Sequence, residues 1–150
     1  MTLTSYGVIT IQTNFEEEAA NFAKAAANAH RVVWQYLEWA MYAAEEVGVP
    51  ILMDFTPYLT GALRESTEAH VWSDNGQFRL QFEQPAQNRY GTEYAPFVIL
   101  GHATRNPEIR VPPNPYNVSA AEEMEAPMNE ILLMAGRKIA ADLTAYMRVA

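Results

Sequence analysis

The stretch that decides the fold is Ala69-His-Val-Trp-Ser-Asp-Asn-Gly-Gln-Phe-Arg-Leu-Gln-Phe82, in which two short β-like runs flank an Asn-Gly pair. Asn and Gly accept the positive φ angles of a tight hairpin turn, so the stretch predicts two antiparallel strands. In the second run apolar and polar side chains alternate, which places Phe78, Leu80 and Phe82 on one face. This alternation predicts a small antiparallel sheet with one buried face.

The segment that precedes the hairpin predicts a strand followed by a long helix. Tyr6–Thr13 is rich in β-branched residues, which favours a short, half-buried strand. Asn14 is a suitable N-cap, and apolar residues then recur at helical spacing as far as Val47. We expect the helix to end there, because Gly48 and Pro50 are typical of the residues that follow a helix.

The second half of this predicted helix carries large apolar side chains on more than one face. Trp34, Trp39 and Met41 lie off the main apolar stripe. A helix of this kind either meets another subunit or is packed between two layers of its own domain. The sequence leaves both interpretations open.

The segments around the hairpin lack a clear periodicity. We expect Ile51–Arg64 to be a loop and Gln84–Gly91 to be an exposed loop. Tyr94–Leu100 is short and apolar, so it fits either one or two helical turns or a buried strand. His102–Tyr116 contains four prolines, which predicts an extended proline-rich arm or loop without regular structure at about residues 102–118.

The C-terminal part predicts a second long helix. The residues Ser119 to Glu122 match a capping box, in which the first serine and the last glutamate satisfy the free amides of a helix start. Pro127 either opens the main helix after a short preceding turn or kinks a single helix. The whole pattern predicts an α+β fold, a small antiparallel sheet packed with a long N-terminal helix and a C-terminal helix.

Composition limits the classes of protein that fit. The chain has 150 residues, 49% of them apolar, which suits a single domain over residues 1–150. Its 18 acidic and 10 basic side chains give a net charge of −8, which argues against a broad DNA-binding face. It has no cysteine, no segment of signal-peptide type and no apolar run of membrane-spanning length. We therefore expect a protein that is made in the cytoplasm and has no membrane partner.

The sequence shows no coherent catalytic or metal-binding set. His30, His70 and His102 fall on a predicted helix, strand and loop, without the spacing of metal ligands. A triad of Ser66, His102 and Asp54 lacks any supporting nucleophile motif. We accordingly expect neither an enzyme nor a cofactor.

Two segments look specified beyond what packing requires. One runs from Phe55 to Ser66, where a turn built on Pro57 and Gly61 leads into Leu-Arg-Glu-Ser, and the other runs from Tyr94 to His102. At these residues the chain resembles the tail-completion and minor-capsid family of long-tailed bacteriophages. The matching positions are Pro57, Thr60, Gly61, Leu63, Arg64, Ser66, Tyr94, Ala95 and Gly101. The family's proline-rich segment before a C-terminal helix is matched by Pro112, Pro113, Pro115 and Pro127.

The resemblance implies a non-enzymatic structural protein of the virion. Such a protein forms a homo-oligomeric ring, expected to be hexameric, that completes the tail tube at the head–tail junction. Its partners are the head connector and the tail-tube proteins, and DNA passes through the ring without specific binding. The implied fold, a small sheet with a long helix before it and one after it, agrees with the pattern above.

Several residues carry specific expectations within this interpretation. We expect Arg64 to bind a carboxylate of its own or the next subunit, and Gly61 to form a turn. The possible interface residues are Trp34, Trp39, Met41, Pro112, Pro113 and Pro115. Part of the acidic excess, Glu16 to Glu18 or Glu122 to Glu125, is expected to face the channel. The alternative function is a monomeric small-ligand-binding or regulatory α+β domain.

Overall fold

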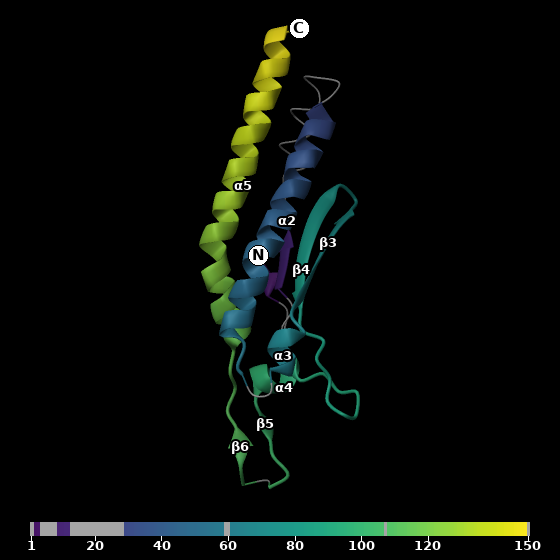
Figure 1. Ribbon diagram of the computed structural model, residues 1–150. Helices are drawn as coiled ribbons and strands as arrows, with labels where there is room; N and C mark the ends of the chain where they lie inside the picture. Colours follow the sequence, from purple (N-terminus) through teal and green to yellow (C-terminus); the bar gives the residue numbers. More distant parts are fainter. Residues whose placement is uncertain (1, 4–8, 13–28, 59–60, 107, 150) are drawn as a thin grey trace.

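The central hairpin has the strands and the turn that its sequence predicts. Figure 1 shows a computed structural model of the chain, which describes residues 2–3, 9–12, 29–58, 61–106 and 108–149. Strands β3 (Glu68–Asp74) and β4 (Gln77–Glu83) pair antiparallel along their whole length. Asn75 and Gly76 connect them with φ angles of 50° and 77°. The expected alternation holds in β4, because Phe78, Leu80 and Phe82 are buried.

The hairpin belongs to an antiparallel sheet that also includes the N-terminal region. The described strands are ordered β1 (Thr2–Leu3), β2 (Ile9–Gln12), β4 and β3. Residue Ile9 of β2 lies opposite Phe82, and Gln12 lies opposite Arg79. The strand predicted over 6–13 is therefore confirmed at 9–12, and its remaining residues lie outside the described part.

Two long helices complete the α+β fold that the sequence predicts. Helix α2 (Ala29–Phe55) lies between the sheet and helix α5 (Tyr116–Val149), and the two helices run in opposite directions (Figure 1). With 34 residues, α5 is about 51 Å long at 1.5 Å per residue. The predicted start of the N-terminal helix at Asn14 lies outside the described residues.

The position of α2 explains why this helix is apolar on more than one face. One face packs against β4 and the other against α5, so of the two interpretations that the sequence left open, packing within its own domain applies to this helix. Met41 is 1% exposed and lies in the core, which corrects its assignment to a subunit interface. Trp34 is half-buried, with its ring centroid 4.4 Å from that of Phe78.

Helix α2 continues past the residues that were expected to end it. Gly48 and Pro50 both lie inside the helix, which runs on to Phe55. Gly48 is buried where α2 meets the sheet, and a β-carbon there would lie 2.3 Å from Phe82 Cζ. Beyond it Leu52 is completely buried in the core. The close packing of the helix on the sheet thus requires glycine at position 48. The same packing outweighs the loss of the backbone hydrogen bond that Pro50 removes.

Helix α5 begins earlier than its capping box predicts. It starts at Tyr116, directly after Pro115, so Ser119 lies inside its first turn and does not cap it. The earlier start is stabilised by burial of Tyr116, which is 3% exposed. Pro127 lies within this single helix, so it does not open the main helix after a short preceding turn.

Short elements occupy the segments without clear periodicity. The prediction of a loop over residues 51–64 is wrong in two places. Residues 51–55 belong to α2, and a short helix, α3 (Ala62–Glu65), begins within the predicted loop. Tyr94–Leu100 resolves into helix α4 (Ala95–Leu100). The proline-rich arm contains two paired two-residue strands, β5 (His102–Ala103) and β6 (Arg110–Val111), so the expectation of no regular structure is wrong there.

Candidate functional site

The two motif segments meet at a single residue, Ala86. The Ala86 amide donates to the Ser66 hydroxyl over 3.2 Å, and the Tyr94 amide donates to the Ala86 carbonyl over 3.0 Å. Segments that are distant in sequence are therefore joined through one short stretch of the loop after β4. We call the structure they form the motif end; it comprises residues 56–58, 61–67, 84–86 and 94–101.

The first motif builds a tight turn and one short helix. Gly61 is buried with φ of +80°, a conformation that side chains disfavour, which confirms it as a turn residue. Its carbonyl accepts from the Glu65 amide over 2.8 Å. Leu63 is buried in the core, and the Ser66 hydroxyl donates to the Leu63 carbonyl over 2.9 Å. Pro57 is half-buried, and Thr60 lies outside the described residues.

Arg64 does not bind a carboxylate of its own chain within the described part of the structure. Its Nη2 donates instead to the carbonyls of Asp54 and Thr56, each over 3.4 Å, at the end of α2. These carbonyls have no further helical turn to supply amides, and a guanidinium is a suitable donor for them. The guanidinium carbon also lies 5.8 Å from the centroid of the Tyr58 ring. Arg64 is thus a C-terminal cap of α2.

The second motif anchors the arm. Ala95 is buried in α4, and Tyr94 is half-buried at its start. Gly101 has φ of +70°, and a β-carbon there would lie 2.6 Å from the Val111 carbonyl oxygen and 2.8 Å from the Pro113 nitrogen. Glycine therefore allows the outgoing and returning segments of the arm to touch at their base.

A buried polar network, which the sequence did not reveal, joins the motif end to α5. Gln84 donates to the hydroxyls of Thr56 and Thr67 over 2.7 Å and 2.8 Å, and it accepts from the Tyr116 hydroxyl over 2.5 Å. Gln84 is 5% exposed, so its assignment to an exposed loop is wrong. The signal was present in the sequence, because the inward alternation of Phe78, Leu80 and Phe82 extends two residues further to Gln84.

Burial in this network changes the acidity of Tyr116. Desolvation of the phenol raises the pKa of Tyr116 from 10.0 to about 12. The neutral phenol is the form that donates to Gln84. In the folded chain the network that links the start of α5, the end of α2 and the end of β4 therefore keeps this hydrogen bond up to a pH of about 12.

The arm presents apolar side chains to solvent. It extends beyond the ends of the long helices (Figure 1), and it exposes Ile109 and Val111. Phe97 and Leu100 of α4 are also exposed, next to its base. The predicted interface prolines, Pro112, Pro113 and Pro115, are all exposed on the returning segment. The arm and its base therefore present an apolar, proline-rich surface to solvent.

The two remaining groups of predicted residues lie on the helices. Trp39 is 39% exposed, and Lys138 Nζ of α5 lies 4.4 Å from the centroid of its ring. Glu122, Glu123 and Glu125 are exposed on α5. The other predicted acidic group, residues 16–18, lies outside the described residues.

Comparison with known proteins identifies no relative, since no family model, curated protein sequence or solved structure matches the chain. In the ranges that the structure describes, no helix is both long enough and apolar enough to cross a membrane.

Proposed function

We propose that this chain is a structural protein of a long-tailed bacteriophage, which forms a ring at the head–tail junction and joins the tail tube to the head connector. The observation that carries the proposal is the meeting of the two family-like motifs at Ala86. The residues on which the family resemblance rests lie together in the structure. They form one end of the molecule and fix the base of the arm.

The arm supplies one half of the contact that a ring requires. A ring of identical subunits uses two different surfaces, one on each neighbour. The arm exposes Ile109 and Val111 at 55% and 38%, and its prolines lose little entropy when it docks. The outer face of α5 exposes Leu133 and Met134 at 61% and 48% and is a suitable receiving surface.

The charge of the chain fits a channel that DNA crosses without being held. Carboxylates repel the phosphate backbone, whereas Lys and Arg would retain it. We assign Glu122, Glu123 and Glu125 to the channel wall, because all of them are exposed on α5. A ring structure with a basic channel would contradict this assignment.

The test is removal of the gene from the phage that encodes the chain. We expect electron micrographs to show DNA-filled heads and finished tails that are not joined, and infectivity to be restored by the wild-type gene supplied in trans. Joined, infectious particles in the absence of the gene would overturn the proposal.

Substitutions in the arm refine the same complementation experiment. Ile109→Asp places a charge on the exposed arm and is expected to abolish both joining and ring formation, with the fold retained. Tyr90→Asp is the matched control, because Tyr90 is 76% exposed in the loop between β4 and α4. It should complement like the wild type. Equal complementation by the two variants would show that the arm is not part of the interface.

A further inference from the structure

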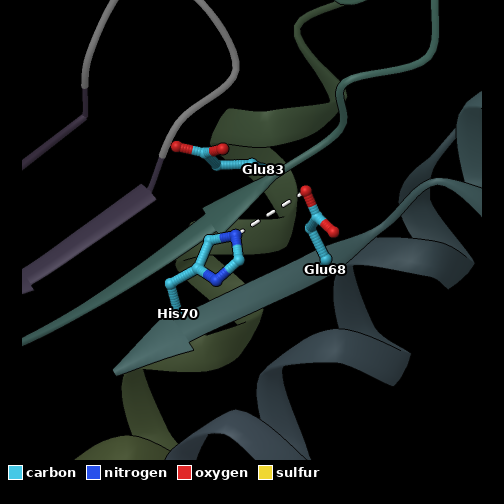
Figure 2. Close-up of side chains that lie close together, drawn as sticks. All are labelled: Glu68, His70 and Glu83. Carbon is cyan, nitrogen blue, oxygen red and sulfur yellow. Dashed lines mark ion pairs between the residues drawn. The ribbon is translucent and has the colours of Figure 1, made fainter. Parts of the chain in front are cut away.

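Three potential metal ligands converge on the outer face of the hairpin. Glu68 and His70 lie on β3 and Glu83 on β4, and one donor atom from each lies within 4.8 Å of the other two (Figure 2). The His70 Nε2 to Glu68 Oε1 distance is 3.6 Å. The residues reach this face because the inward positions of β4 belong to Leu80 and Phe82.

The strand register forces the two carboxylates together. Glu68 is the direct cross-strand partner of Glu83, and His70 is the partner of Gln81. Like charges directly opposite each other destabilise an antiparallel pair. The Gln81 side-chain amide donates to Glu83 Oε1 and holds one of these carboxylates in place. A cation bound between the carboxylates would remove the repulsion.

The chemistry of the three donor atoms indicates which cation would bind. One imidazole and two carboxylates suit Zn²⁺, which accepts both ligand types and commonly has three protein ligands and one water. At bond lengths of about 2.0–2.2 Å, the ligands of a tetrahedral zinc lie roughly 3.3–3.6 Å apart. His70 and Glu68 already have this separation, and both side chains are about half exposed, at 54% and 49%. One oxygen of Glu83 lies within 4.8 Å of the other two donor atoms, so the third ligand is already beside them.

We infer that Glu68, His70 and Glu83 form a zinc-binding site, with His70 Nε2 and one oxygen of each glutamate as ligands and a fourth position open to solvent. In this arrangement Gln81 is a positioning residue, because it orients Glu83 without touching the ion. The site lies on the outer face of the sheet and includes no residue of the adjoining motif end, and the inference does not depend on the proposed function.

Isothermal titration of the untagged full-length chain with zinc chloride tests the inference. We expect one zinc per chain, with a dissociation constant in the micromolar range. His70→Ala and Glu83→Gln should each weaken binding at least about tenfold, because each removes one ligand. Both side chains lie on the outer face, so circular dichroism should show a native fold for both variants.

Matched controls separate this site from adventitious binding. His102→Ala removes an exposed histidine on β5, and Glu93→Gln removes an exposed carboxylate outside the cluster. Neither should change the zinc affinity. In NMR spectra of the wild type, zinc should shift the amide signals of β3 and β4 and leave those of the arm unchanged. Failure to bind zinc, or equal losses in His70→Ala and His102→Ala, would overturn the inference.

Discussion

Gly48 illustrates how a single residue is determined by tertiary packing rather than by local preference. In the sequence it resembles the end of a helix, yet it lies inside α2 against the ring of Phe82. Replacing a helical glycine by alanine normally stabilises a protein by about 1 kcal/mol. Here an added β-carbon would lie 2.3 Å from Phe82 Cζ and 3.0 Å from Met128 Cε.

Gly48→Ala should therefore destabilise the chain, by about 1–3 kcal/mol as for other overpacked cores. Chemical denaturation followed by circular dichroism measures the change. Gly136→Ala is the matched control, because no described atom lies within 4 Å of a β-carbon at this position of α5. It should stabilise the chain by up to about 1 kcal/mol. The same sign for both substitutions would refute the packing explanation.

Tyr116 supplies a prediction about alkaline pH. Its pKa is 10.0 in the unfolded chain and about 12 in the folded chain, so the folded state retains the phenolic proton longer. The free energy of unfolding should consequently fall by about 1.4 kcal/mol per pH unit between pH 10 and 12, and be unaffected by this group below pH 10. Denaturation curves across this range measure the slope.

Tyr116→Phe is the control for that slope. It leaves the side-chain amide oxygen (Oε1) of Gln84 without its donor, so at neutral pH it should cost about 1–3 kcal/mol. Between pH 10 and 12 the variant should lose less stability than the wild type. The comparison is needed because a hydrogen bond to Asp142 also raises the pKa of Tyr36. Parallel curves for the two proteins would contradict the role of Tyr116.

At the residue scale, the sequence correctly predicted the role of residues that are determined by local backbone conformation. Gly61 and Gly76 have the positive φ angles that their turns require. The sequence did not predict the contacts of residues whose partners lie far away along the chain. Within its own chain Arg64 donates to backbone carbonyls rather than to a carboxylate, and Met41 lies in the core rather than at a subunit interface. Both outcomes depend on how α2 is placed against the sheet and α5, which no local pattern contains.

At the scale of elements, the hairpin and both long helices were predictable, but the helix ends were not. Alternation and an Asn-Gly turn define β3 and β4 locally. The end of α2 depends on burial of Leu52, and the start of α5 depends on burial of Tyr116. Such burial outweighed the stop signal at Gly48–Pro50 and the capping box at Ser119.

The turn before α3 gives a prediction at this scale. Gly61→Val places a β-branched side chain at φ of +80°, which costs about 1–2 kcal/mol, and should reduce both solubility and assembly. Gly61→Asn should be better tolerated, because asparagine adopts this conformation more readily. Thermal unfolding and light scattering measure the two effects. Unchanged folding and oligomerisation of Gly61→Val would show that the turn has no special role.

At the scale of the whole molecule, α2 is packed between the sheet and α5, and this arrangement leaves the arm and the outer face of α5 available to other chains (Figure 1). The motif end links the arm to the core through Ala86 and through the network around Gln84. These hydrogen bonds connect the base of the arm to both long helices.

The most direct test of the central claim is the mass of the chain in solution, measured by light scattering after size-exclusion chromatography over a concentration series, with and without tail tubes. The account predicts a closed ring with about six times the 16.9 kDa mass of one chain, alone or bound to the tubes. A mass of 16.9 kDa at every concentration, with no binding to tail tubes, would contradict it.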